Sequence, residues 1–549
     1  MTPTIGIIAP LIDREQFNAD FNLRLGINKK ELTLAALYEL ASEGFRVDRI
    51  SRGIDHEEDM PAAGYYIEGL LRQQGFDTVL TNRFDTASLE VVAKHDPFAV
   101  CVSATMIVTA DSLVELLAAI RKVMPDTFII AGGMLIWKNY LLYRKHRDNP
   151  DINPLHPWML FHPDHAGLEA DVLVAAPHGR SSLLEVLAIL GKDRGASLQH
   201  IPNLALPRNG GFEFTARVEE SVDYNEDFTR WDLIGSTPAK IPIRTSIGCP
   251  YRCRFCDFCQ LMPSIFIRSR ESLERELALA RARLGHEPAI IHVTDDNVFI
   301  NRQRLREVCT AIARSGLNHW IGFMRARDFS AEEMALLEHS GLMMGMIGAE
   351  SGDQGQLDRM NKRQKVENLK KGVEQLDAHG ISTLMTFVVG FPGENRQTLA
   401  NTAGFLNDLS LSKALASYQL YPLLIEPLSG LDEPSFRAEW KLEGSMEKWS
   451  HFTMNSMEAA EASYELFREV TNLPYHYSEE SNFFNRSMFS LETRKALYSI
   501  RHRLTVMLME NAPWDRITAN LAEMARLMEM PDSNIPSSLK QEILIPAHG

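Results

Sequence analysis

Residues 241–256, IPIRTSIGCPYRCRFC, join a short run of β-branched residues to three cysteines in the spacing C-x3-C-x2-C. The run predicts a buried β-strand, and the glycine and proline after it predict a loop. Such a loop brings the thiols of Cys249, Cys253 and Cys256 close together. A fourth cysteine, Cys259, follows, so four of the chain's six cysteines stand within residues 249–259.

Several thiols on one loop suit some kinds of site better than others. A disulfide framework belongs to short secreted chains, whereas this chain has 549 residues. A structural zinc site is less favoured, because no second Cys/His pair lies at finger spacing. An iron–sulfur cluster prefers cysteine sulfur and commonly takes four such ligands, so Cys259 could close the site and make it a plain electron carrier. Cys101 and Cys309 lie in apolar patterns and are predicted to be core residues.

The strand before the cysteines is the first of six in residues 240–430. Helical patterns such as ESLERELALARARL (271–284) separate these strands, which predicts six βα units in series. Six units form a partial version of the eight-unit barrel, whose chemistry gathers at the carboxyl ends of its strands. The predicted strands are IPIRTSI (241–247), AIIHVTD (289–295), HWIGFMR (319–325), MMGMIGAE (343–350), LMTFVVG (384–390) and ASYQLYPLL (416–424).

Polar residues recur where the predicted barrel strands end. Glu350 follows an apolar run that a parallel sheet buries, so its carboxylate requires a partner. The segment GFPGE (390–394) is either a ligand-lining loop or a turn before a helix, and both roles remain open for Glu394. The other candidates are Asp295, Asp296, Arg325, Arg327, Ser351 and Tyr421.

The first 200 residues read as β-α-β-α-β, which predicts a doubly wound, Rossmann-like parallel sheet that binds a ligand beyond the carboxyl ends of its strands. Small residues occupy two of these ends: Ser103, Ala104 and Thr105, and then Gly132 and Gly133. Each has an ordinary role in a turn or a cap, but together they suit a large flat ligand. A dinucleotide is disfavoured, because the chain has no GxGxxG sequence.

Turn residues, charge and apolar stretches indicate the remaining segments of the chain and its surroundings. A linker over residues 201–239 is predicted to include a hairpin near residues 209–211, and residues 431–549 are predicted to be a helical cap. The formal charge of −15 disfavours nucleic acid as a partner. No membrane span is expected, since the most apolar stretch, FAVCVSATMIVTA (98–110), is short and partly polar. The start lacks the features of a signal peptide, so a cytoplasmic protein is expected.

Taken in order, CPYRCRFC (249–256), HVTDDNVF (292–299), GMIGAESG (345–352) and VVGFPGE (388–394) resemble the radical S-adenosylmethionine enzymes. The SATM (103–106) and AGG (131–133) segments, with the hairpin IPNLALPRNGG (201–211), resemble the members of that family that carry an N-terminal cobalamin-binding domain. The resemblance covers most of the chain.

The resemblance implies three cofactors: a [4Fe–4S] cluster, S-adenosylmethionine and cobalamin. It implies that Cys249, Cys253 and Cys256 hold three irons, while the fourth iron binds S-adenosylmethionine and Cys259 is not a ligand. It implies that Glu350 accepts a hydrogen bond from the methionine amino group, and that Ser351, Gly390, Pro392 and Gly393 belong to the same site. The cobalamin residues would be Ser103, Thr105, Gly132 and Gly133.

No D-x-H-x-x-G sequence is present to supply a histidine to cobalt, and His162 and His165 in HPDHAG (162–167) have the wrong spacing. Neither histidine is therefore expected to bind cobalt.

Three functions follow from the resemblance. The first is methylation of an unactivated carbon or phosphorus in a small-molecule biosynthetic intermediate, such as a phosphinate antibiotic precursor, with an external flavodoxin- or ferredoxin-type electron donor. The second is cyclisation or rearrangement without methyl transfer. The third is a cobalamin- and cluster-binding sensor, which would leave Glu350 and GFPGE without a role.

Overall fold

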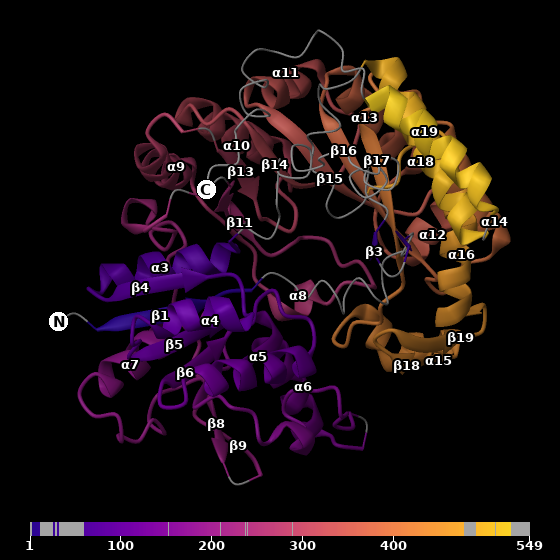
Figure 1. Ribbon diagram of the computed structural model, residues 1–549. Coiled ribbons are helices and arrows are strands. Elements are labelled where there is room, and N and C mark those ends of the chain that lie inside the picture. The colour runs from indigo at the N-terminus through magenta and orange to yellow at the C-terminus, as the bar shows by residue number, and fades with distance from the viewer. Residues whose placement is uncertain are drawn as a thin grey trace.

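The computed structural model describes residues 3–10, 26–27, 30–31, 60–476 and 490–528, apart from residues 152, 209, 237, 239, 288 and 511. Two main β-sheets organise these residues, one in the N-terminal part of the chain and one in the central part (Figure 1). Short pairs β2 (Gly26–Ile27) with β3 (Lys30–Glu31) and β11 (Ser246–Ile247) with β12 (Phe266–Ile267) lie outside both sheets.

The N-terminal sheet has seven strands in the order β4-β1-β5-β6-β7-β8-β9. The first five pair in parallel, and the last two form an antiparallel hairpin on the β7 edge. The strands are β1 (Thr4–Ile8), β4 (Asp77–Thr81), β5 (Ala99–Ser103), β6 (Phe128–Gly132), β7 (Val172–Val174), β8 (Leu204–Arg208) and β9 (Gly211–Phe214). The predicted doubly wound sheet is confirmed.

The predicted division at residue 200 is too early for this sheet. The hairpin was assigned to a linker, but Leu204 and Ala205 of β8 pair with Val174 and Leu173 of β7. Both residues of β8 are fully buried, so the hairpin completes the N-terminal core rather than connecting two domains.

Helices cover both faces of this sheet. Leu71 of α3 and Val186 of α7 pack with Ile5 and Ile7 on one face. α4, α5 and α6 pack on the other, where α5 buries Leu113, Leu116, Leu117 and Ile120 at helical spacing. The helices are α3 (Ala62–Gln73), α4 (Thr86–Ala93), α5 (Ala110–Val123), α6 (Met134–Asp148) and α7 (Arg180–Leu190). The segment ELTLAALYELASEG (31–44) has the apolar spacing of a helix, but beyond residue 31 it lies outside the described residues.

The central sheet has six parallel strands in chain order, as predicted. Among the described residues β10 and β17 form its two edges, so the barrel is partial and open. The strands are β10 (Lys240–Ile243), β13 (Ile290–Val293), β14 (Trp320–Met324), β15 (Leu342–Glu350), β16 (Ser382–Val389) and β17 (Ala416–Pro422). The connecting helices are α8 (Phe258–Leu261), α9 (Arg270–Leu284), α10 (Arg302–Ser315), α11 (Ala331–His339), α12 (Gln354–Arg359), α13 (Val366–Ala378) and α14 (Arg396–Asn407).

The C-terminal part is only partly helical, which corrects the prediction for residues 431–549. Residues 443–455 form a three-stranded antiparallel sheet of β18 (Glu443–Ser445), β19 (Lys448–His451) and β20 (Met454–Asn455). Gly444 makes this possible, because its φ of +80° is open to glycine and a Cβ there would lie 2.9 Å from Trp449 Cα. The helices are α15 (Pro434–Trp440), α16 (Ser456–Glu469), α18 (Leu491–Met509) and α19 (Trp514–Met528), and Figure 1 shows the last two beside β17 and α16.

A search of the described residues for a helix long and apolar enough to cross a membrane found none.

Candidate functional site

The cysteine loop starts at the carboxyl end of β10 and is anchored from the neighbouring strand. Asp295, which follows β13, accepts hydrogen bonds from Thr245 N and Thr245 Oγ1, both at 2.6 Å, and from Ser246 Oγ at 2.6 Å. Its side chain is fully buried, and burial raises its pKa. Asp295 therefore fixes the base of the loop rather than facing a ligand.

The next residue, Asp296, is exposed and remains a candidate to face a ligand. Desolvation at the crowded strand ends raises the pKa of Asp296 to about 6, while Arg244 opposes that shift.

The loop itself is held by backbone contacts to distant segments. Arg254 N donates to Met360 O at 2.9 Å, and Asn361 Nδ2 donates to Arg252 O at 2.7 Å. Gly248 has a φ of +84°, and a Cβ there would lie 3.2 Å from Ile265 Cα, so a larger residue would strain the turn into the loop. The cysteines thus lie on a loop whose path is set from three sides.

Cys249, Cys253 and Cys256 are partly buried free thiols on this loop. Burial raises the pKa of all three, to about 12 for Cys256. In the part of the chain that the structure describes, no three Cys, His, Asp or Glu side chains converge on a position for a single metal ion.

Three cysteines that each bind a different iron of one cluster need not meet at a point. As soft donors on one constrained loop, the three thiols fit such a cluster. Cys259 lies beyond them on α8, where its sulfur approaches Cys256 O at 4.0 Å.

Glu350 ends β15 beside this loop and has a buried partner. Its Oε1 lies 2.7 Å from Lys362 Nζ, and both residues are 7% exposed. Lys362 Nζ also lies 5.8 Å from the ring centre of Phe255, within the cysteine loop. A Cβ at Gly348 would meet the Glu350 carboxylate and lie 2.9 Å from Lys362 Nζ, so glycine is required to admit this ion pair. The expected partner of Glu350 is therefore present, but the sequence had not singled out Lys362.

The two arginines after β14 have different environments. Arg325 stacks over Tyr251 of the cysteine loop at 3.9 Å from the ring centre and donates to Lys362 O. Arg327 instead pairs with Glu333 at 2.7 Å and, through its hydrogen bonds, lowers the pKa of Glu333 to about 2. Only Arg325 belongs to the surroundings of the cysteines.

Ser351 follows Glu350 but turns toward α14. Its hydroxyl lies 3.3 Å from Thr402 Oγ1 and accepts a hydrogen bond from Asp353 N at 3.1 Å. These contacts give Ser351 a role in the turn into α12, while its place in a cofactor site stays a prediction.

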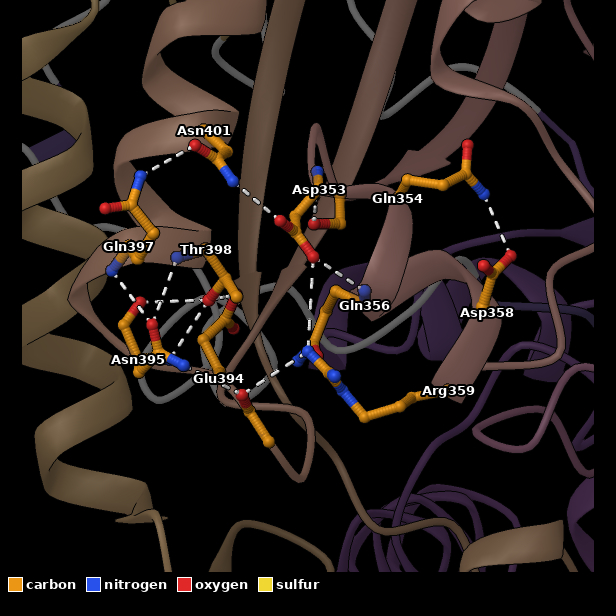
Figure 2. Close-up of polar contacts among 12 residues, drawn as sticks. Asp353, Gln354, Gln356, Asp358, Arg359, Glu394, Asn395, Gln397, Thr398 and Asn401 are labelled. Carbon is orange, nitrogen blue, oxygen red and sulfur yellow. Dashed lines mark hydrogen bonds and ion pairs between the residues drawn. The ribbon is translucent and has the colours of Figure 1, made fainter.

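The GFPGE loop is a tight turn closed by its own glutamate. Gly390 and Gly393 have φ values of +95° and +93°, and Gly390 N donates to Glu394 Oε2 at 2.6 Å. Glu394 is 2% exposed, and burial raises its pKa to about 7. Figure 2 shows Glu394 beside Thr398 and Asn395 at the start of α14, with Arg359 approaching from α12. The carboxyl group of Glu394 thus stabilises the turn, and a cofactor-binding role for Gly390, Pro392 and Gly393 stays a prediction.

The small residues at the ends of β5 and β6 (Ser103, Ala104, Thr105, Gly132 and Gly133), here called the floor, are partly open to solvent. Thr105 is exposed, and Gly132 and Gly133 are partly exposed. A Cβ at Gly133 would lie 2.7 Å from Thr105 N, so glycine lets the loops after β5 and β6 pack closely. Ser103 is buried and donates to Thr105 Oγ1 at 3.3 Å. Thr105, Gly132 and Gly133 thus present small residues to solvent at this sheet edge, and their place in a cobalamin site stays a prediction.

His162 and His165 lie near the N-terminal sheet but have local partners. His162 Nδ1 accepts a hydrogen bond from Asp164 N at 3.2 Å, and His165 Nε2 lies 2.9 Å from Pro157 O. Both rings therefore have hydrogen-bond partners within residues 157–165.

One ion-pair cluster joins the N-terminal sheet to the cysteine loop. Lys138 Nζ on α6 lies 2.9 Å from Asp257, the residue after Cys256, and also pairs with Glu426. Sequence reasoning missed these three residues, because no local pattern relates positions so far apart.

The central part of this chain matches a family model. Residues 243–406 match the Radical SAM superfamily, a range that includes the cysteine loop, Glu350 and GFPGE. This match confirms the resemblance inferred from the sequence motifs.

Among curated relatives, the chain is 27% identical over 164 residues to the anaerobic magnesium-protoporphyrin IX monomethyl ester cyclase of Rubrivivax gelatinosus. That match covers 29% of this chain and 29% of the relative, so the chain matches less than a third of that protein's length.

Two solved structures share the fold. One is the radical S-adenosylmethionine methyltransferase TsrM from Kitasatospora setae with tryptophan substrate and a S-adenosylmethionine analogue bound, with a TM-score of 0.51 and 16% identity over 78% of this chain and 75% of that chain. The other is the cobalamin-dependent S-adenosylmethionine radical enzyme OxsB with aqua-cobalamin and S-adenosylmethionine bound, with a TM-score of 0.56 and 14% identity over 99% of this chain and 78% of that chain.

Proposed function

Because residues 243–406 match the Radical SAM superfamily, we propose that the chain is a cobalamin-dependent methyltransferase. Its substrate is a small-molecule biosynthetic intermediate, methylated at an unactivated carbon or phosphorus, with a phosphinate as one candidate. The observation that carries this proposal is the position of the cysteine loop. The loop touches the Glu350–Lys362 pair on one side and the N-terminal unit on the other.

The chain's own residues divide the binding tasks. Cys249, Cys253 and Cys256 would hold the cluster, and the floor at Thr105, Gly132 and Gly133 would hold cobalamin. When bound, the cluster with S-adenosylmethionine supplies a radical from one electron, and cobalamin supplies a methyl group. The electron would come from an external flavodoxin- or ferredoxin-type protein.

Glu350 would orient S-adenosylmethionine through its amino group. Its carboxylate already accepts from Lys362 with one oxygen, Oε1, which leaves Oε2 for a ligand. Being nearly buried, this carboxylate would accept a strong, charge-assisted hydrogen bond from an ammonium. The backbone of GFPGE would line the adenine.

An apolar surface for substrate is available on the inner face of the barrel. Phe323 of β14 is 44% exposed although it lies in the middle of a parallel strand. It is in register with Met346 of β15, two residues before Gly348 on the same face of the sheet. These side chains would exclude water from the radical and contact a small organic substrate.

The alternative enzyme class is cyclisation or rearrangement. The similarity to the Rubrivivax gelatinosus cyclase supports this alternative. A sensor is the third possibility, but it gives the nearly buried Glu350–Lys362 pair no ligand to orient.

By-product analysis tests the proposal. With substrate, cobalamin and a strong reductant, methylation consumes two molecules of S-adenosylmethionine per product, so 5′-deoxyadenosine and S-adenosylhomocysteine should accumulate in equal amounts with methylated product. Formation of 5′-deoxyadenosine without S-adenosylhomocysteine, and a product of unchanged carbon count, would instead support the cyclase class.

A further inference from the structure

Helix α6 connects the two sites that the proposed function needs. Its N-cap is Gly133, in the small-residue floor, and Lys138 lies five residues later. At 1.5 Å of rise per residue, these positions are about 7.5 Å apart along the helix axis. The floor and the residues that touch the cysteine loop are therefore parts of one rigid element.

Two contacts attach α6 to the short helix that follows the cysteines. Lys138 Nζ lies 2.9 Å from Asp257 Oδ2 and pairs with Glu426 Oε2. The residue before Lys138, Trp137, contacts the other end of α8. Its Nε1 donates a hydrogen bond to Leu261 O at 3.0 Å. Asp257 is the N-cap of α8, so both ends of α8 are held by α6.

The contact region is largely closed to solvent. The side chains of Lys138, Asp257 and Glu426 are 17%, 16% and 25% exposed. Leu261, Met262 and Leu428 belong to the same hydrophobic core as α5 and α6. Removing the ammonium would leave two carboxylates facing each other in this poorly solvated place, which strongly disfavours the closed arrangement.

We propose that Lys138 is a positioning residue that fixes the cysteine loop relative to the floor of the N-terminal sheet. It thereby sets the distance over which a methyl group passes from one site to the other. This inference rests on the proposed function. Lys138 contacts neither thiols nor the floor, and it acts through Asp257 and α6.

S-adenosylmethionine has two reactions, and measuring both distinguishes a substitution that disturbs positioning from one that disturbs folding. Reductive cleavage needs one electron from the reductant and gives methionine and an adenosyl radical, which takes a hydrogen atom from a C–H or P–H bond of the substrate or, without substrate, from a component of the solution to become 5′-deoxyadenosine. Methylation of reduced cobalamin moves the methyl group, without its bonding electrons, from sulfur to the cobalt(I) electron pair and releases S-adenosylhomocysteine. The first reaction needs only the central domain, whereas the second also needs the correct distance to the N-terminal floor.

The test variant is Lys138→Met in the full chain with reconstituted cluster, added cobalamin and titanium(III) citrate as reductant. A displacement of about 1 Å can cost on the order of 100-fold in rate, so S-adenosylhomocysteine should fall about tenfold or more. Iron content and 5′-deoxyadenosine should equal those of the unmodified protein. The proposal would be overturned if both products fell equally, or if neither product fell.

Three further variants control the result. Glu426→Gln should keep both products, because Lys138 retains Asp257. Arg121→Met breaks the 2.8 Å ion pair with Asp171 elsewhere in the N-terminal unit and should also keep both. Trp137→Phe removes the hydrogen bond to Leu261 but keeps an aromatic ring, so it should lower S-adenosylhomocysteine less than Lys138→Met does. If Lys138→Met does not fold, this variant decides, and unchanged S-adenosylhomocysteine would overturn the proposal.

A second readout needs no cofactor. In the cofactor-free protein, amide hydrogen exchange of residues 254–262 should be faster in Lys138→Met than in Arg121→Met. If the unmodified protein releases no S-adenosylhomocysteine, the proposed methyl transfer is wrong. The exchange rates alone then test whether Lys138 holds the cysteine loop against α6. Identical exchange in the two variants would then refute it.

Discussion

Glu350 has a backbone conformation that few glutamates adopt, with a φ of +65° at the end of a buried strand. A non-glycine residue in this region is held there at a cost of about 1–2 kcal/mol, and such residues gather at functional sites. The ion pair with Lys362 and the glycine at position 348 maintain this arrangement. The sequence could predict Glu350, because an apolar run precedes it, but not Lys362, which follows in a different segment with no periodic relation to it.

Replacing Glu350 tests its role directly. Glu350→Gln should weaken S-adenosylmethionine binding by about 10- to 100-fold, the worth of one charge-assisted hydrogen bond of ~1.5–3 kcal/mol. Gly348→Ala should have a similar effect, since its methyl group would displace the carboxylate. Equilibrium binding to the cluster-loaded protein measures both, with iron content as the control. Unchanged affinity in Glu350→Gln would remove this residue from the site.

The raised pKa of Glu394 predicts how the free energy of unfolding depends on pH. Its folded-state pKa is raised to about 7 from 4.5, so its stabilising contribution is complete below about pH 4.5 and is lost as the pH rises through 7. The loss is on the order of 3 kcal/mol. Glu394→Gln does not titrate, so its unfolding free energy should rise relative to the unmodified protein between pH 5 and pH 8. Denaturation at both pH values, with the exposed Glu367→Gln as control, measures this, and a constant difference would contradict it.

Loops that follow strands determine what the central domain can bind. The six strands and the cysteine loop could be predicted because apolar periodicity and cysteine spacing are local signals. The role of Asp295 could not, because it depends on Thr245 and Ser246, which lie in the segment after the neighbouring strand β10. The small sheet at residues 443–455 was also missed, because its strands are short and its turn depends on Gly444.

The cysteine loop predicts a specific pattern of metal loss. Anaerobic reconstitution should give about four irons per chain, and Cys249→Ala, Cys253→Ala and Cys256→Ala should each abolish the cluster. Cys259→Ala is the matched control, because it removes a neighbouring thiol on α8 rather than on the loop. Iron analysis and the electron paramagnetic resonance signal of the reduced cluster measure the outcome. Loss of iron in Cys259→Ala would make that residue a ligand.

At the scale of the whole molecule, the two main sheets belong to neighbouring parts of the molecule, and α8, the short helix that follows the cysteine loop, lies between these parts (Figure 1). Sequence reasoning predicted both sheets, since each is a series of βα units. It could not predict their contact through Lys138, Asp257 and Glu426, because that contact depends on how the two sheets pack.

Cobalamin dependence tests this account most directly. The protein with its cluster, S-adenosylmethionine and titanium(III) citrate should release S-adenosylhomocysteine when cobalamin is added and none when it is omitted, whereas 5′-deoxyadenosine should form in both cases. This measurement needs no knowledge of the substrate. S-adenosylhomocysteine that forms equally without cobalamin, or not at all with it, would contradict methyl transfer between the two sheets.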